Sequence, residues 1–306
     1  MSYALQLQAR MAAAPAAVYR ALTNTTALET WFAENADVSL PEQRFEFWGR
    51  HTPQGERGHH ALLTATPGKL LRFSWKLDGQ RTIVEIRLVP DGEDHTILRL
   101  HQDGLPTLEE MLSPTGRRDG LHTMHTFWGL ALANLAEYFD GRALTPKADF
   151  RASRSDEIRV SLEIAASPEA VFASLVDPEQ VKDWFGWEIE IEPRLEGKIT
   201  LGADGKIFEF ESAQRLAYSE PDGSVVRWEL EGSDAKTYLT FVQTGYADDE
   251  WDSAAQHEAG WLGSLAELKR MHELGKDWMP LITERPSGDE PNSETDRRRQ
   301  DRTDLP

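Results

Sequence analysis

The sequence predicts an α+β protein that contains two copies of one domain. The stretch PAAVYRALTNTTALETWF begins at Pro15, and a closely similar stretch, PEAVFASLVDPEQVKDWF, begins at Pro168. Segments in which apolar and polar residues alternate follow each stretch, and a long segment with helical spacing closes each copy. We therefore predict one domain at residues 1–147 and a second at residues 156–282. Residues 284–306 are almost devoid of apolar side chains, which predicts a disordered tail.

Each copy is predicted to begin with a β-strand and two short helices. Apolar and polar residues alternate from Tyr3 in SYALQLQARM and from Ile158 in IRVSLEI, as expected for strands with one buried face. Pro15 and Pro168 fit the first turn of a helix, where a missing N–H is tolerated. The segment that ends in Trp-Phe in both copies follows directly and is predicted to form the second helix.

A meander of about six antiparallel strands is predicted to follow the helices. In the first copy the alternating segments are separated by TPQGERG, TPGK, LDGQ and PDGED. The Gly and Asp residues in these breaks adopt the backbone conformations that hairpins need, so the strands on either side should be neighbours in the sheet. The first-copy segments lie around Arg44, Ala61, Leu71, Val84 and Leu98.

A long helix is predicted at the end of each copy. In the first copy it runs from about Asp119 to Phe139, and the Asp-Gly pair at Asp140 ends it with a glycine. FWGLALANLAEYF and GWLGSLAELKRMH align at an offset of 133, which pairs Trp128 with Trp261. Because the offset at the start of the copies is 153, the second copy has lost about twenty residues, a change that loops tolerate best.

The inward faces of the strands and of the closing helix predict an apolar hollow in each copy. Apolar residues spaced three and four apart form a stripe along one side of each closing helix. One polar residue interrupts each stripe, one turn before the tryptophan: His125 in the first copy and Glu258 in the second. Burying an unpaired polar group is unfavourable by about 1–3 kcal/mol. This turn is therefore predicted to be either the mouth of a pocket or the solvated end of the stripe. The candidate ligand-binding residues are Phe45, Phe47, Phe73, Trp75, Leu100, His125 and Trp128 in the first copy, and Phe208, Phe210, Tyr218, Trp228, Phe241, Glu258 and Trp261 in the second.

Composition and charge exclude several classes of protein. The 306 residues include 40% hydrophobic and 28% charged residues, as in ordinary globular proteins, and no cysteine, which excludes disulfides and thiolate chemistry. Residues 148–283 hold 28 acidic and 13 basic side chains, against 17 and 15 in residues 1–147. A net charge of −19 repels nucleic acid phosphates and anionic lipids, so neither nucleic acid nor membrane is an expected partner. No secretion signal is recognisable, which predicts a cytoplasmic protein.

No metal site, cofactor or catalytic motif is predicted. His122 and His125 are spaced i, i+3, with His59, His60 or His101 as further ligands, but nothing in the sequence fixes a third ligand beside them. Histidine at the rim of a pocket is the favoured interpretation. The nucleophile elbow, the phosphate-binding loop, H-E-x-x-H and G-x-G-x-x-G are all missing. Acid–base chemistry in a pocket would need only one positioned group, which the polar residue of either helical stripe would supply.

Taken together, the motifs resemble those of a known family. The P-x-x-V-[YF]-x-x-L start, the Trp-Phe end of the second helix, the Asp-Gly hairpins, LRFSW and the final W-x-x-x-L-x-x-L are similar to the activator of heat-shock protein 90 ATPase homologue domain of the START-like (SRPBCC) superfamily. The resemblance covers about residues 1–147 and again about residues 156–275. It implies two helix-grip, Bet v-like domains, in each of which a curved antiparallel sheet wraps the long helix and leaves a cavity.

Three functions are compatible with this pattern. The favoured one is a non-catalytic module that holds a small hydrophobic or aromatic ligand in one or both cavities. A co-chaperone that stimulates heat-shock protein 90 is implied by the resemblance, although eukaryotic activators join a different domain to a single copy. An enzyme with a pocket acid or base is the third. Since many START-like proteins dimerise, the tandem copies also predict a monomeric pseudo-dimer, with PKADFRASRSD from Pro146 as its linker.

Overall fold

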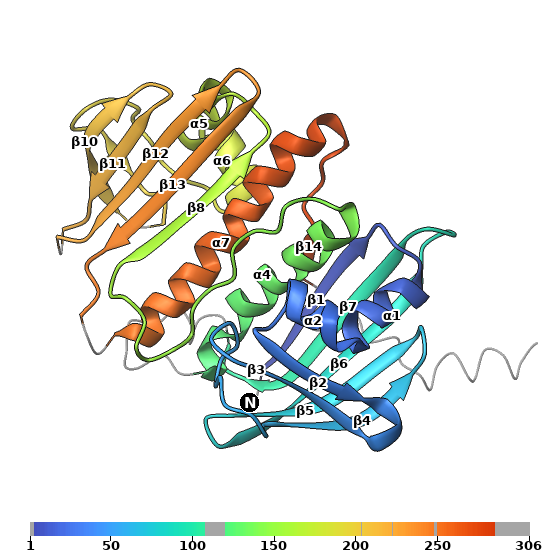
Figure 1. Cartoon of the computed structure of the whole chain (residues 1–306). Helices are drawn as coiled ribbons and strands as arrows, with labels where there is room; N and C mark the ends of the chain where they lie inside the picture. Colours follow the sequence, from blue (N-terminus) through green and yellow to red (C-terminus); the bar gives the residue numbers. More distant parts are fainter. Residues whose placement is uncertain (1–2, 108–119, 203, 222, 248–249, 285–306) are drawn as a thin grey trace, which may run out of the picture.

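The computed structural model describes residues 3–107, 120–202, 204–221, 223–247 and 250–284. They form two halves with a common order of elements (Figure 1). The first half contains β1 (Tyr3–Met11), α1 (Pro15–Thr23), α2 (Thr25–Trp31), β2 (Asn35–Ser39), β3 (Arg44–Trp48), β4 (His60–Thr66), β5 (Leu70–Leu77), β6 (Gln80–Pro90), β7 (Thr96–Leu105) and α4 (Gly120–Asp140). The second half contains β8 (Ile158–Ile164), α5 (Pro168–Val176), α6 (Pro178–Phe185), β9 (Lys198–Ile199), β10 (Gly205–Glu211), β11 (Arg215–Ser219), β12 (Val225–Ser233), β13 (Lys236–Thr244), α7 (Trp251–Leu274) and β14 (Ile282–Glu284). The predicted tail lies outside the described residues, apart from the end of β14.

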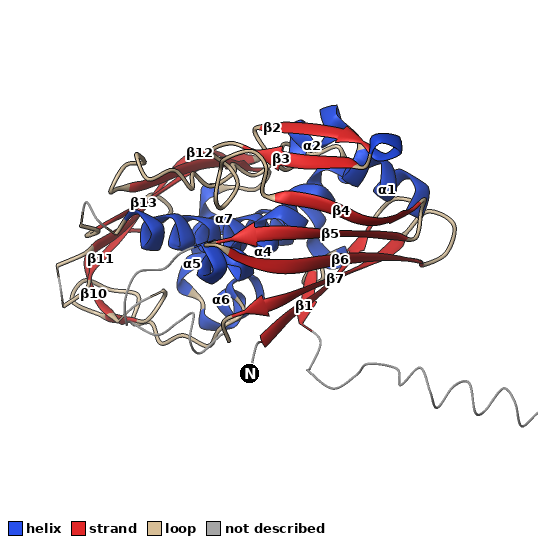
Figure 2. Ribbon diagram, turned by 90° about the horizontal axis from the view of Figure 1, so that it is seen from below, coloured by secondary structure: helices blue, strands red, loops and turns tan. Residues whose placement is uncertain are grey.

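Each half builds one antiparallel sheet around its long helix. The strand order is β14-β1-β7-β6-β5-β4 in the first sheet and β8-β13-β12-β11-β10-β9 in the second, and β2 pairs with β3 as a separate hairpin. In Figure 1 the two long helices lie side by side in the middle of the molecule, with one sheet on either side. Figure 2 shows the strands and helices from below. The α+β, helix-grip prediction is confirmed for both halves.

In the described strands for which inward residues were predicted, alternation identifies the buried face correctly, except in β10. Leu71, Phe73 and Trp75 on β5 are buried, as are Val226 and Trp228 on β12. Side chains on the opposite face of these strands are more exposed. Each sheet therefore contributes an apolar face to the core, and burial of such side chains contributes about 1.5–3 kcal/mol each to folding.

Strand β10 departs from the predicted alternation. Phe208 was predicted to face inward together with Phe210, but its side chain is 42% exposed, while Ile207 is fully buried. A register shift between Ile207 and Glu209 marks a β-bulge against β11. The extra residue of a bulge reverses the alternation on either side of it, so Ile207 and Phe210 both face the core and Phe208 points outward.

Helices α4 and α7 pack along each other in parallel. A Cβ atom added to Gly260 would lie 3.4 Å from the Thr126 side chain, and one added to Gly263 would lie 3.6 Å from the backbone nitrogen of Leu130. Leu130 and Gly263 are equivalent in the two copies, since 263 − 130 gives the helix offset of 133. Contact between equivalent positions is typical of a two-fold interface, here formed within one chain. Within the described residues, no helix has the length and apolar character of a membrane span.

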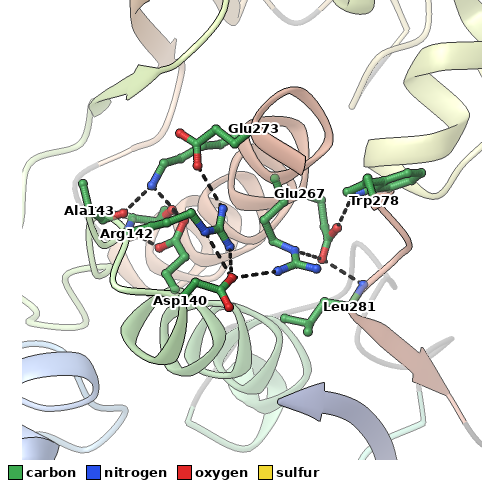
Figure 3. Close-up of polar contacts among 11 residues, drawn as sticks. Asp140, Arg142, Ala143, Glu267, Glu273, Trp278 and Leu281 are labelled. Atoms are coloured by element: carbon green, nitrogen blue, oxygen red, sulfur yellow. Dashed lines mark hydrogen bonds and ion pairs between the residues drawn. The ribbon is translucent and has the colours of Figure 1, made fainter. Parts of the chain in front are cut away.

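A buried ion cluster joins the C-terminal ends of α4 and α7 (Figure 3). The Lys269 ammonium of α7 donates to Glu137 Oε1 of α4 at 2.9 Å, and the two side chains are 3% and 0% exposed. Thr145 donates to the same carboxylate through its backbone nitrogen and its hydroxyl. Arg142 connects Asp140 of α4 to Glu273 of α7. Separation of the two helix ends is disfavoured by this cluster, because breaking a buried ion pair leaves an uncompensated charge.

The end of the described chain crosses back to the first half. Strand β14 follows α7 but pairs with β1, with Ile282 opposite Ala9 and Glu284 opposite Leu7. The matching edge strand of the second half, β8, pairs only with β13 among the described strands. The two halves are therefore tied together at one sheet edge as well as along their helices.

Candidate functional site

A groove opens between α6, α7 and α4, and we call it the open groove. It has a volume of about 960 Å³. Its walls come mainly from the end of α6 and the residues after it, from the N-terminal half of α7, and from α4 of the first half. Pro280, Leu281 and Ile282, just before and at the start of β14, line one end. The aromatic lining residues are Trp184, Phe185, Trp187 and Trp261.

Local structure positions the aromatic residues of the open groove. The α6 helix ends at Gly186, which adopts a left-handed conformation with φ of 83°. Trp184 donates through its indole nitrogen to Ser174 O, which holds it inward, and the Phe185 ring stacks on Trp261 at 5.5 Å between ring centroids. Gly202 borders the same tryptophan: a Cβ atom there would lie 2.6 Å from the Trp261 ring. A glycine is therefore required beside this wall.

The open groove is acidic. Its lining includes five carboxylate residues but, among the described residues that line it, no lysine or arginine. Burial raises the pKa of Glu267, although the nearby Arg270 opposes this rise. Glu188 forms an exposed ion pair with Lys182 at 2.8 Å. The carboxylate residues are Asp183, Glu188, Asp204, Glu220 and Glu267, and the two histidines are His125 and His257.

The equivalent site of the first half lies on the other side of the helix pair, where α2 meets α4 and α7. The linker between the halves, from Lys147 to Arg154, occupies it, and we call it the linker site. Lys147 donates from its ammonium to the carbonyls of Glu29, Thr30 and Ala33 at the end of α2, at 3.3, 2.8 and 3.5 Å. These carbonyls form the negative end of the helix dipole. Burial lowers the pKa of Lys147, and the nearby Arg50 lowers it further. A lysine ammonium is thus held at the end of a short helix.

The following linker residues fill the linker site with backbone and apolar contacts. His51 donates from Nδ1 to Ala148 O at 3.0 Å, and the Phe150 backbone nitrogen donates to Arg50 O at 2.7 Å. The buried Phe150 ring packs edge-on against Phe127 of α4 at 5.8 Å between ring centroids. The linker therefore lies in this site as an extended, partly buried segment.

Glu258 of α7 belongs to the linker site. Its carboxylate accepts from the Asp149 backbone nitrogen at 3.0 Å and from Arg154 at 2.7 Å. Burial raises the pKa of Glu258, while Arg154 acts in the opposite direction. Its equivalent in α4, at 258 − 133, is His125, which lines the open groove. The two polar residues that interrupt the helical stripes thus mark the same place in two equivalent sites.

The two sites share one framework. Phe32 stacks on Trp128 at 5.7 Å in the first half, as Phe185 does on Trp261 in the second. The offset of 153 relates α2 to α6, and the offset of 133 relates α4 to α7. The equivalent residues are Glu29 and Lys182, Thr30 and Asp183, Ala33 and Gly186, Asn35 and Glu188, Phe127 and Gly260, and Glu258 and His125.

The structure distributes the fourteen predicted ligand-binding residues among different environments. His125 and Trp261 line the open groove, Glu258 lies in the linker site, and Phe208 is exposed. Phe210 packs against the core beside Phe172. Their role in ligand binding stays a prediction. The remaining nine are buried and pack within the two cores: Phe45, Phe47, Phe73, Trp75, Leu100, Trp128, Tyr218, Trp228 and Phe241.

Reasoning from single copies missed most of the open groove. Trp184 and Phe185 had a signal, because the Trp-Phe pair ends the second helix in both copies. Gly260 could also have been noticed in the sequence, because it stands in place of Phe127 within an otherwise similar helix. Of the α4 residues, His125 was predicted, but Thr126, Gly129 and Ala133 were not, because their place in the groove depends on how the two halves dock.

Comparison with known proteins identifies the family. The family model described as activator of Hsp90 ATPase homolog 1-like protein matches residues 12–140 and again residues 165–273. The chain belongs to this family and carries its domain twice. A comparison with curated protein sequences gives no match.

Solved structures that are similar to this chain each cover 30–39% of it. A protein from Mesorhizobium loti is 19% identical, with 39% of this chain and 98% of that chain covered and a TM-score of 0.36. The Aha1 dimer from Colwellia psychrerythraea is 22% identical, with 39% and 98% covered and a TM-score of 0.35. A Plasmodium falciparum protein described as an HSP90 activator is 18% identical, with 30% and 74% covered and a TM-score of 0.28.

Proposed function

We propose that the protein is a non-catalytic binding module that holds a small hydrophobic or aromatic ligand in the open groove. The observation that carries the proposal is the groove itself. Its volume of about 960 Å³ lies within the range of about 300–1,000 Å³ in which ligand sites fall. Its walls combine several aromatic rings with a few polar groups, as ligand sites do. The proposal keeps the cytoplasmic location expected from the sequence.

Aromatic contact supplies the binding energy in this proposal. Trp187 is 57% exposed and lines the groove, so it can lose further surface to a ligand without rearrangement of the core. Removal of each 100 Å² of apolar surface from water contributes about 2.5 kcal/mol before the entropic cost of association. The stacked Phe185 and Trp261 rings offer a rigid second wall.

Titration with the uncharged aromatic dye N-phenyl-1-naphthylamine tests the proposal. The dye is expected to bind with a rise in its fluorescence, and Trp187→Ala is expected to weaken binding about tenfold through lost ring contact. Tyr238→Ala is the matched control, because Tyr238 is similarly exposed, at 54%, but lies on β13 away from the groove lining. Absence of dye binding, or equal weakening by both substitutions, would refute the proposal.

Stimulation of the heat-shock protein 90 ATPase is the second candidate function. Membership of the family of activators of Hsp90 ATPase homolog 1-like proteins favours it. An ATPase assay with the chaperone of the same cell tests it directly: stimulation that saturates with added protein would support this function. No change in ATP turnover at a several-fold excess of the protein would exclude it.

A further inference from the structure

We propose that the open groove recognises an extended peptide segment of a partner protein, in which a lysine or arginine is followed three residues later by an aromatic residue. This inference rests on the proposed function, because it names the ligand class of the same groove. The linker site provides the template: there the chain places Lys147 and Phe150, three residues apart, in the equivalent position.

The cation of such a peptide is expected to lie at the end of α6. In the linker site the Lys147 ammonium contacts the carbonyls of residues 29, 30 and 33. Their equivalents are residues 182, 183 and 186, and Asp183 and Gly186 line the open groove. Two of the three equivalent positions therefore border the groove at the C-terminal end of a helix, which attracts cations. The two helix ends differ in backbone geometry, because Gly186 is left-handed and its nitrogen donates to Lys182 O, whereas α2 ends at a right-handed Phe32.

The lining of the open groove carries carboxylates but, among the described residues that line it, no lysine or arginine. Asp183 stands where the first half has Thr30, and Glu188 stands where it has Asn35. Both carboxylate residues line the groove, together with Asp204 from the loop after β9. Lys182, which stands where the first half has Glu29, pairs with Glu188 at 2.8 Å and is not among the described residues that line the groove. The carboxylates left to attract a cation beside the helix end are Asp183 and Asp204, and an acidic peptide would be repelled.

Space for an aromatic side chain comes from a single difference between the helices. Phe127 of α4 packs against Phe150 of the linker. Its equivalent in α7 is Gly260, which lines the open groove and has only the Thr126 side chain near its missing Cβ position. A peptide aromatic residue can therefore lie deeper than Phe150 does and reach the Trp261 wall.

Backbone contacts favour a peptide over a small amine. In the linker site two of the contacts involve main-chain groups of the bound segment: Ala148 O accepts from His51, and the Phe150 nitrogen donates to Arg50 O. The loop after β9, with Gly202 and Asp204, borders the open groove where residues 49–51 border the linker. An extended peptide offers main-chain groups for hydrogen bonds like those of the linker, which a small amine lacks.

Binding of a peptide with the sequence TPKADFR, copied from residues 145–151, tests the inference on the full chain. Fluorescence anisotropy of the labelled peptide is expected to show saturable binding, weakened about tenfold when its lysine is replaced by glutamate or its phenylalanine by alanine. Asp183→Asn in the protein is expected to weaken binding about fivefold, and Trp187→Ala more strongly. Asp234→Asn is the matched control, since Asp234 lies outside the groove lining.

Different failures have different meanings. If the dye binds and Trp187→Ala weakens it, but the peptide does not bind or its lysine is irrelevant, the peptide inference falls and the ligand-binding proposal stands. If neither binds, both fall. A chain that ends at Glu284 and binds the peptide at least tenfold more tightly would show that residues 285–306, which contain Arg297, Arg298 and Arg299, are the natural occupant, and would overturn the assignment to a partner.

Discussion

The linker site and the open groove are two versions of one place in the fold, and they differ in what fills them. Both lie where a short helix meets the α4–α7 pair, and both have a stacked phenylalanine and tryptophan as one wall. In the first half the chain supplies Lys147 to Phe150 as occupant. In the second half the chain turns away at Leu281 and continues into β14. A duplicated domain can thus fill a site with its own chain in one copy and leave the equivalent site open in the other.

The helix pair differs in charge between its two members. Glu137 of α4 and Arg270 of α7 are equivalent, since 137 + 133 = 270, and they carry opposite charges. Asp140 of α4 lies 3.9 Å from Arg270. Two α4 helices packed in the same way would place Asp140 beside Glu137, which like-charge repulsion disfavours. Divergence of the copies therefore favours pairing within one chain over pairing between identical halves.

The largest expected effect follows from breaking the buried ion pair that holds the two sites around one helix pair. Lys269→Ala leaves Glu137 buried without its cation, so the free energy of unfolding is expected to fall by about 3–5 kcal/mol. Urea unfolding measures this loss. Lys236→Ala is the control, because its pair with Glu163 is exposed and should contribute at most about 1 kcal/mol. Equal losses would show that the cluster does not fix the helix pair.

Arg154→Ala weakens the linker site alone. It removes the cation beside Glu258, so the free energy of unfolding is expected to fall by about 3 kcal/mol at pH 8. Burial raises the folded-state pKa of Glu258, so the folded protein holds this proton more tightly than the unfolded chain does. The stability that protonated Glu258 contributes is therefore lost as pH rises above the ordinary pKa of a glutamate. The loss of unfolding free energy caused by Arg154→Ala should accordingly be smaller at pH 4 than at pH 8. Urea titrations at both pH values check this, and a larger defect at pH 4 would contradict it.

Gly202→Ala perturbs the open groove alone. The residue has a φ of 80°, and its new Cβ would clash with the Trp261 ring, so we expect a loss of about 2–3 kcal/mol and a changed tryptophan fluorescence. Gly186→Ala has a similar φ of 83° but no atom near the new Cβ, so it isolates the backbone strain, about 1–2 kcal/mol. Identical fluorescence changes in the two variants would argue against a tight wall at Trp261.

Acid is expected to destabilise the first half before the second. Burial lowers the pKa of His60 to about 3, and its ring lies against Phe47 and Trp75. Because the unfolded histidine binds its proton near pH 6.5, stability is present above that value and is lost as pH falls, by about 2 kcal/mol at pH 5. Hydrogen exchange should show β4–β6 losing protection before β10–β12, and His60→Phe should remove the difference. Equal loss in wild type would disprove this.

Most of the fold could be predicted from periodicity, because strand alternation and helical spacing are set by backbone geometry within a few residues. The alternation of Leu71, Phe73 and Trp75 identifies their buried face without any knowledge of the partner strands. It failed at Phe208, because a β-bulge depends on how β10 aligns with β11, which no single strand encodes.

The candidate site was less accessible from the sequence. Its position near His125 followed from a polar residue in an apolar stretch of the helix. The matching Glu258 lies in the linker site instead. A hollow was predicted between sheet and helix. Instead, Phe47, Trp75 and the other core rings pack against one another there. How side chains pack against one another depends on their shapes in three dimensions. The alternation of residues along a strand shows only to which face each side chain points.

By itself, the sequence determined that one domain occurs twice, which faces of most strands are apolar, and that the second copy is the acidic one. These properties depend on local geometry and composition. Only the tertiary structure decided that α4 and α7 run side by side, that the linker occupies one of two equivalent sites, and that β14 joins the sheet of the other half. Each of these depends on contacts between residues more than a hundred positions apart, such as Glu137 with Lys269 and Lys147 with Thr30, which no short-range pattern specifies.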